Sequence, residues 1–206
     1  MINPLTLLPF FVPFLMPHPH VPKAIAMQGA GGTTKVTWFT VPYNAEQVKT
    51  LPNGRTWHMG FASLEVGMPL QCGEVTIPVG KYKLDVLRAD SGEFTELQLT
   101  PTEMLALRPR RGQQPDPAKV EAVKKDLAAR GIPELIHLPA KSYDDPAAEH
   151  LEFMVLNRGF EAVQRGSSEP KGGASFTLMA TFGDLHRKVD LVEVFVPPAP
   201  AKDAGK

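Results

Sequence analysis

Residues 80–99 read GKYKLDVLRADSGEFTELQL, and this stretch decides the fold. Tyr82, Leu84 and Val86 alternate with polar residues, which predicts a half-buried strand with one wet side. An Asp-Ser-Gly turn signal follows, and a second alternating run returns from it. Two alternating runs joined by a short turn are typical of a β-hairpin. The stretch therefore predicts antiparallel β structure.

Runs of the same kind recur along the body of the chain. Eight or nine short strands at regular spacing, with one inserted helix, favour an antiparallel sandwich over a βαβ fold. We therefore expect a mainly β protein, an immunoglobulin-like or jelly-roll-like antiparallel β-sandwich. The other runs that predict strands are residues 35–41, 61–66, 74–77, 149–156, 160–164, 174–182 and 185–196.

One helix interrupts the strand pattern. Asp116 suits the N-cap position, and Pro117 suits the first helical position. From Val120 onward, apolar residues recur at helical spacing on one face. Gly131 supplies the stop signal. We expect this helix at residues 117–130, as an insertion within the sandwich rather than a second domain.

The two ends of the chain differ from its body. An apolar run over residues 5–16, followed by the small residues Ala24 and Ala26, is typical of a signal peptide. The run is too short to span a membrane. No Lys or Arg precedes it and prolines interrupt it, so an apolar N-terminal arm is the alternative. The expected organisation is a signal peptide or arm over residues 1–26, a Gly-rich linker over 27–34, the sandwich domain over 35–196 and a disordered tail over 197–206.

The charge balance argues against one class of partner. Lys plus Arg and Asp plus Glu are equal at 22 each, so the formal net charge is zero. Proteins that bind phosphate backbones normally carry a basic surplus. We therefore expect no nucleic-acid partner. The single cysteine, Cys72, cannot close an intramolecular disulfide and is interpreted as a small, half-buried residue.

The sequence contains no recognisable metal-ligand or catalytic motif. No glycine loop has the context of a phosphate site, and no serine or cysteine has the context of a nucleophile. We expect no metal and no cofactor, and we assign no catalytic residue. His18 and His20 are close enough to chelate, but cleavage after Ala26 would remove them. The other histidines stand singly, at His58, His137, His150 and His186.

The stretch that follows the Asn53-Gly54 turn carries the candidate ligand site. Trp57 offers flat apolar area and His58 a polar handle, so the pair suits a ligand platform near one end of the sheets. In the alternative interpretation, Trp57 is the large core residue of the sandwich, and its indole N–H bonds to backbone. The candidate ligand-binding residues are Tyr43, Arg55, Trp57 and His58.

Residues 54–66 and 75–84 carry a Trp-x-x-Gly motif and then an Ile-Pro-x-Gly-x-Tyr-x-Leu pattern. This combination resembles an uncharacterised bacterial family of exported β-sandwich proteins, known as a domain of unknown function. The resemblance covers roughly residues 35–99 and 149–195. It implies the fold and export but no activity. Members of that family often have Arg after the motif Trp, where this chain has His58, so a role of that Arg does not carry over.

The leading hypothesis is an exported, non-enzymatic protein, periplasmic or secreted, that binds a small ligand or a protein partner or serves as an accessory. One alternative is a hydrolase or metal-dependent enzyme whose site assembles from scattered histidines and acidic residues. Another is an accessory subunit of an envelope or membrane complex. Membrane association is expected only if the N-terminal arm is retained.

Overall fold

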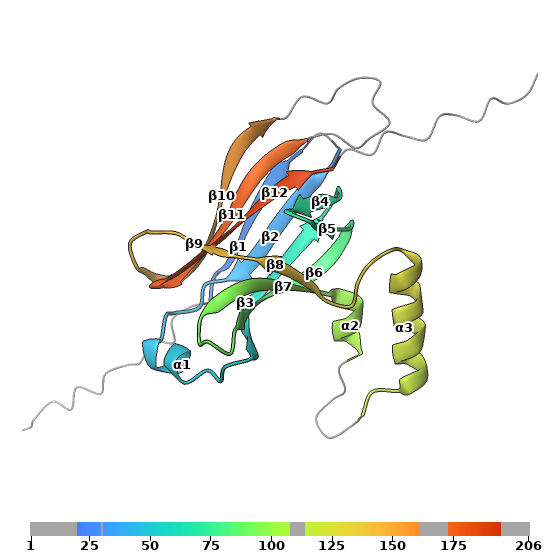
Figure 1. The fold of residues 1–206 in the computed structure, drawn as a ribbon, viewed down its shortest axis with the longest axis horizontal. Helices are drawn as coiled ribbons and strands as arrows, with labels where there is room; N and C mark the ends of the chain where they lie inside the picture. Colours follow the sequence, from blue (N-terminus) through green and yellow to red (C-terminus); the bar gives the residue numbers. More distant parts are fainter. Residues whose placement is uncertain (1–19, 30, 108–113, 161–172, 195–206) are drawn as a thin grey trace, which may run out of the picture.

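A computed structural model describes residues 20–29, 31–107, 114–160 and 173–194 of the chain. Two antiparallel β-sheets pack against each other (Figure 1). The first has the strand order β1-β2-β3-β6-β7-β8, and the second has the order β10-β11-β12-β4-β5, with β9 also paired to β12. The predicted antiparallel β-sandwich with one main helix is confirmed.

The strands are grouped by the sheet to which they belong. The first sheet contains β1 (Pro22–Gln28), β2 (Thr33–Phe39), β3 (Arg55–Val66), β6 (Gly80–Arg88), β7 (Phe94–Pro101) and β8 (Ile136–Pro139). The second contains β4 (Leu70–Cys72), β5 (Val75–Ile77), β9 (Lys141–Ser142), β10 (Ala148–Phe160), β11 (Ala174–Gly183) and β12 (Leu185–Glu193). The helices are α1 (Ala45–Lys49), α2 (Thr102–Ala106) and α3 (Pro117–Ala129).

The β6–β7 hairpin forms as its alternation predicts. Tyr82, Leu84 and Val86 are all buried and face the core between the sheets. Aromatic contacts join the two layers, including an edge-to-face contact of Trp38 with Phe153 at 5.3 Å between ring centroids. Each fully buried large apolar side chain contributes about 1.5–3 kcal/mol, so the interlayer core is the main stabilising feature of the fold.

The helix α3 is also confirmed, including its ends. The Ala118 N–H donates to Asp116 Oδ1 at 3.0 Å, which is the predicted N-cap. Gly131 adopts a φ of +68°, the left-handed conformation that ends many helices. Leu127 is buried and anchors the helix to the core. Figure 1 shows α2 and α3 side by side at one side of the sandwich.

The N-terminal boundary of the domain differs from the prediction. Strand β1 covers residues 22–28 and pairs with β2 along its whole length. The sandwich therefore begins in the segment interpreted as the end of a leader, and the predicted linker over residues 27–34 is wrong. Cleavage after Ala26 would remove most of β1. The expected signal-peptide core and the expected tail lie outside the described residues.

The glycines between β1 and β2 make a tight turn rather than a flexible connection. The Gly29 N–H donates to the Gly32 carbonyl oxygen at 2.9 Å. A Cβ on Gly29 would lie 1.4 Å from Glu193 Oε1, and one on Gly32 would lie 2.7 Å from the Gly67 carbonyl oxygen. These glycines are needed because other parts of the fold approach them closely. Composition alone shows the glycines but not these neighbours.

Strand β10 is longer than expected. The two strands predicted at residues 149–156 and 160–164 correspond to one strand that runs to Phe160, with irregular pairing near each end. Gly159 has a φ of +115°, and the register against β11 shifts beside it. The irregularity explains why the alternation appears broken at this point in the sequence. Residues 161–164 lie outside the described part of the chain.

Candidate functional site

The candidate site lies beside a bulge in β3. The register of β3 against β6 shifts between His58, which is opposite Asp85, and Ser63, which is opposite Lys83. The bulge contains Phe61, whose φ of +57° is the one positive value for a non-glycine residue in the described part of the chain. Its side chain is 81% exposed. Bulges and strained backbone cluster at functional sites because they redirect side chains.

A pocket of about 650 Å³ opens next to this bulge. Small-molecule sites commonly have volumes of about 300–1,000 Å³, so the pocket is large enough for such a ligand. Its lining residues come from β3, β6, α1 and α2 and from the segments at His20 and Val41. Its lining residues are His20, Val41, Gln47, Trp57, His58, Phe61, Ala62, Ser63, Lys83, Thr102 and Leu105.

Three polar side chains meet beside the pocket, of which His58 and Lys83 line it and Asp85 does not. Lys83 Nζ lies 2.9 Å from Asp85 Oδ2 and 2.6 Å from His58 Nδ1. His58 Nδ1 also lies 3.1 Å from Asp85 Oδ1. The side chains of Lys83 and Asp85 are 13% and 3% exposed, whereas that of His58 is 56% exposed. The ammonium and the carboxylate therefore compensate each other away from bulk water.

His58 Nδ1 lies close to both Lys83 and Asp85, but a ring nitrogen makes one hydrogen bond. It accepts a hydrogen bond from the Lys83 ammonium or donates one to Asp85 Oδ1, but not both. In the described structure Asp85 Oδ1 receives no hydrogen bond, although it is within ion-pair distance of the imidazole. A buried acceptor without a donor is costly. Asp85 Oδ1 is thus able to accept a hydrogen bond from the His58 imidazole when Nδ1 carries a proton.

Trp57 belongs to both the core and the pocket. Its ring centroid lies 4.6 Å from that of Phe182 and 6.5 Å from that of Phe94, so it packs between the sheets. It also lines the pocket beside the bulge. The indole N–H bond to backbone that we expected for Trp57 is instead made by Trp38, which donates to the Leu151 carbonyl oxygen at 3.1 Å. The ligand role of Trp57 stays a prediction.

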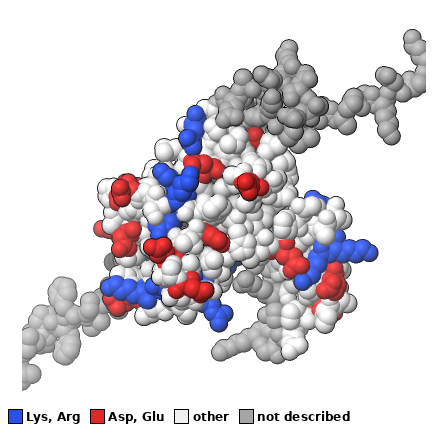
Figure 2. All heavy atoms as spheres, in the orientation of Figure 1, with Lys and Arg blue, Asp and Glu red and all other residues white. Residues whose placement is uncertain are grey.

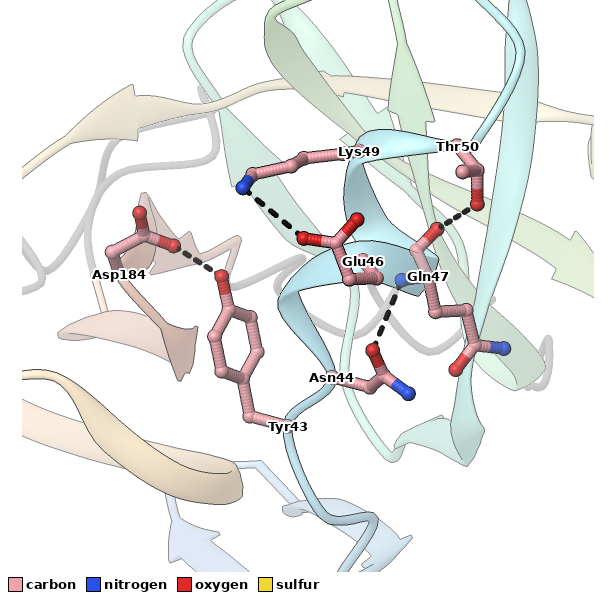
Figure 3. Close-up of polar contacts among 7 residues, drawn as sticks. All are labelled: Tyr43, Asn44, Glu46, Gln47, Lys49, Thr50 and Asp184. Carbon is pink, nitrogen blue, oxygen red and sulfur yellow. Dashed lines mark hydrogen bonds and ion pairs between the residues drawn. The ribbon is translucent and has the colours of Figure 1, made fainter.

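Tyr43 lies on the same aromatic row but outside the pocket lining. Its ring is 5.1 Å from that of Phe182, which also contacts Trp57. The Tyr43 hydroxyl donates to Asp184 Oδ1 at 2.7 Å (Figure 3), and this bond raises the pKa of the phenol. Tyr43 therefore fixes the segment that leads into α1 against the second sheet.

The helix α1 follows directly and presents Gln47 to the pocket. Asn44 caps it by accepting a hydrogen bond from the Gln47 N–H at 3.1 Å, and Thr50 closes its other end by donating to the Gln47 carbonyl oxygen at 3.0 Å. Figure 3 also shows the Glu46–Lys49 ion pair along the helix. Tyr43 and Asn44 thus act as positioning residues for one wall of the pocket.

Arg55, the remaining candidate, is not part of this arrangement. It is exposed at the start of β3, opposite Arg88 of β6, and does not line the pocket. The sequence interpretation also missed Lys83 and Asp85, because it assigned both to the wet face of β6. Their alternation was correct, but their burial depends on elements that pack over that face. Phe61 was missed because nothing local indicates its positive φ.

Among the described residues, no group of three or more His, Cys, Asp or Glu side chains is placed to hold a metal ion. His137 pairs with Glu96 at 2.7 Å, and His186 Nε2 contacts the Gly183 carbonyl oxygen at 3.2 Å. Cys72 is fully rather than half-buried, and burial raises the pKa of its thiol. His18 lies outside the described residues.

Comparison of the chain with models of protein families, with curated proteins and with solved structures found no match in any of the three. The resemblance to an uncharacterised family of exported proteins stays a prediction. Within the described ranges, no helix has the length and apolar character needed to cross a membrane.

Proposed function

We propose that this chain is an exported, non-enzymatic β-sandwich protein that binds a small amphipathic ligand in the pocket beside the β3 bulge. The observation that carries the proposal is the position of Phe61, an exposed aromatic ring held in a strained conformation at the mouth of the pocket. Such a conformation costs about 1–3 kcal/mol and persists where the surrounding structure enforces it. In return, the strained conformation places an aromatic ring in the wall of the pocket.

The lining indicates the chemistry of the ligand. Trp57, Phe61 and Leu105 offer apolar surface for a flat or aliphatic body. Lys83 offers a donor at the pocket, and the buried Asp85, which does not line the pocket, balances its charge. Because Asp85 balances the charge of Lys83, the site favours a neutral head group. Gln47 and Ser63 of the lining both donate and accept, which suits an amide or a hydroxyl. Figure 2 shows acidic and basic side chains interspersed over the visible face.

Binding is tested with naphthalene-2-carboxamide, a flat apolar body with an amide head group, followed by heteronuclear NMR. We expect chemical-shift changes at Phe61, Lys83 and Leu105, and weaker binding of 2-methylnaphthalene, which lacks the amide. Phe61→Ala should weaken binding of the amide, whereas Val79→Ala, at an exposed apolar residue outside the pocket lining, should not. Shifts confined to another surface, or equal binding by Phe61→Ala, would contradict the proposal.

One observation favours a second candidate, a hydrolase. His58 Nδ1 lies 3.1 Å from a buried carboxylate, which is the arrangement that orients a histidine as a general base. Ser63 lines the same pocket, with its hydroxyl 2.6 Å from that of Thr37. Hydrolysis of 4-nitrophenyl acetate separates the two functions. A rate above buffer that His58→Ala abolishes would favour the enzyme, and equal rates for both proteins would exclude this use of His58.

Export is tested by N-terminal sequencing of the protein purified from its native cell. Because β1 starts at Pro22 and pairs throughout with β2, cleavage that preserves the fold would lie before Pro22. A mature N-terminus in that region, in an extracytoplasmic fraction, is the expected result. An intact Met1 in the cytoplasm refutes export. An intact Met1 in a membrane fraction would instead favour the accessory subunit anchored by its N-terminal arm.

A further inference from the structure

Strand β10 forms one edge of the second sheet, and only its first part has a neighbour on the outer side. There the Tyr43 N–H donates to the Glu149 carbonyl oxygen at 2.8 Å, and the Leu151 N–H donates to the Val41 carbonyl oxygen at 2.9 Å. Within the described residues, no backbone group continues this pairing beyond Leu151. The rest of β10 is an open edge in the part of the chain that the structure describes.

The direction of the backbone groups on this edge follows from Leu151. N–H and C=O groups alternate between the two sides of a strand, so residues at every second position share a direction. Phe153, Val155 and Asn157 therefore direct their backbone groups outward, as Leu151 does. The intervening residues direct theirs toward β11, with which β10 is paired in regular register from Glu152 to Asn157.

The side chains on the face of β10 that points away from the core follow an ordered series. Met154 and Leu156 are 45% and 52% exposed, although both are large and apolar. Glu152 precedes them and Arg158 follows them at the same two-residue spacing. The sequence of side chains along this face is thus acidic, apolar, apolar, basic. When two copies of this series run antiparallel, the acidic residue of each is opposite the basic residue of the other, and the apolar residues are opposite each other.

We propose that two copies of this chain pair through β10, antiparallel and centred on Val155, so that their second sheets become one continuous sheet. In this register, Glu152 of each copy is opposite Arg158 of the other, and Met154 is opposite Leu156. The outward backbone groups of Val155 then bond to each other across the two-fold axis. Opposite charges and apolar pairs directly across from each other stabilise antiparallel strands.

Alternative registers lose this complementarity. Moving the centre to Met154 places Glu152 opposite Leu156, and moving it to Leu156 places Glu152 opposite Phe160. Both moves remove the two ion pairs. Within one chain, Glu152 contacts Lys23 at 2.5 Å and Arg158 contacts Asp190 at 3.0 Å, so both charges are already held at the edge. A second copy would join these pairs into one network of alternating charges.

A groove beside the edge adds apolar surface to this interface. It has a volume of about 340 Å³ and is lined by Ile25 and Met27 of β1 together with Val155 and Phe176 of the second sheet. The groove lies where the edges of the two sheets, β1 and β10, approach each other. Val155 of a second copy would lie beside this groove, because it faces the same side of the joined sheet as Val155 of the first copy.

The test is analytical ultracentrifugation of the full chain over a wide range of concentrations. We expect a monomer–dimer equilibrium. Glu152→Arg alone and Arg158→Glu alone place like charges opposite each other and should each weaken the dimer about tenfold. The double variant exchanges the charges and should restore the dimer. Lys81→Glu is the matched control for Arg158→Glu, since it makes the same change in net charge at an exposed pair on the other sheet.

The double variant also separates dimerisation from folding. It breaks the contacts of Glu152 with Lys23 and of Arg158 with Asp190 as surely as the single variants do, so recovery of the dimer cannot come from the intrachain pairs. Circular dichroism on heating, at a concentration at which all variants are monomeric, should show the double variant no more stable than either single variant. A chain that stays monomeric at every concentration, or a double variant as weak as the single ones, overturns the proposal.

Discussion

Lys83 Nζ lies 2.9 Å from Asp85 Oδ2, and both side chains are nearly buried. The two residues are two positions apart on β6 and therefore share a face of the first sheet. A buried ion pair of this kind adds little net stability, because removing both charges from water offsets their attraction. Removing one partner is different, since the other charge is then buried without compensation. Comparing the removal of one partner with the removal of both therefore tests whether the Lys83–Asp85 pair is buried.

Lys83→Met is expected to lower the free energy of unfolding by about 3 kcal/mol, because Asp85 loses its cation. Lys83→Met combined with Asp85→Asn should recover part of this loss, since no uncompensated charge remains. Urea denaturation measures both. If Lys83→Met costs less than about 1 kcal/mol, the pair behaves as a solvent-exposed one and the cluster is open to water.

Phe61→Gly should separate stability from binding. Glycine adopts a positive φ without the steric cost of a Cβ, so we expect the free energy of unfolding to stay level or rise by about 1 kcal/mol. Binding of naphthalene-2-carboxamide should weaken, because the aromatic wall is gone. Phe61→Ala is the control, since it also lacks the ring but keeps the strain. A loss of stability in Phe61→Gly relative to Phe61→Ala would show that the backbone at Phe61 is not strained.

Gly32→Ala tests the tight turn between β1 and β2. The new Cβ would lie 2.7 Å from the Gly67 carbonyl oxygen, and backbone cannot move aside as cheaply as a side chain. We expect thermal denaturation to report a loss of about 1–3 kcal/mol. Gly73→Ala is the matched control, since Gly73 has a φ of +58° but no neighbouring atom within 4 Å of a Cβ. Its cost should be that of the conformation alone, about 1 kcal/mol.

Tyr82 makes the stability of the fold depend on pH in the alkaline range. Burial raises the pKa of its phenol from 10.0 to about 12. The folded state therefore holds the proton more tightly than the unfolded state, so this contribution is full below pH 10 and is lost as the pH rises toward about 12. Urea denaturation across this range should show a fall in stability.

Tyr82→Phe should remove that part of the fall while keeping the ring in the core. The variant also loses the hydrogen bond from the Tyr82 hydroxyl to the Pro78 carbonyl oxygen at 2.7 Å, so its stability at neutral pH should be lower by about 1 kcal/mol. Ultraviolet absorbance of tyrosinate gives an independent reading. Ionisation of Tyr82 near pH 10 in the folded protein would show that its hydroxyl is in contact with water.

Local signals in the sequence were sufficient for much of the fold. The β6–β7 hairpin and the helix α3 depend on alternation, capping residues and a stop glycine, all of which act between near neighbours. The turn at Gly29 and Gly32 was missed because its meaning depends on Glu193 and Gly67, which are distant in the sequence. The glycine-rich composition suggested a flexible segment, whereas the fold uses these glycines because other parts of the chain approach them closely.

The candidate site was predictable only in part. Trp57 and His58 stand out by residue type, and the structure places both at the pocket. Lys83 and Asp85 have no such signal, because a strand pattern tells which face a residue occupies but not what covers that face. The bulge at Phe61 shifts the register between β3 and β6, and a shift of this kind arises from the pairing of two strands.

The pairing of Leu70 in β4 with Glu193 in β12 sets the order in which the protein can assemble during synthesis. Most strands of the first sheet pair with a neighbour in the sequence, so that sheet can begin to form early. The β4–β5 hairpin has no partner strand for β4 until β12 has left the ribosome. Until then its open side is exposed to other chains, so a truncation before β12 should yield an aggregating product rather than a smaller domain. Strand β12 therefore completes the second sheet only late in the synthesis of this domain.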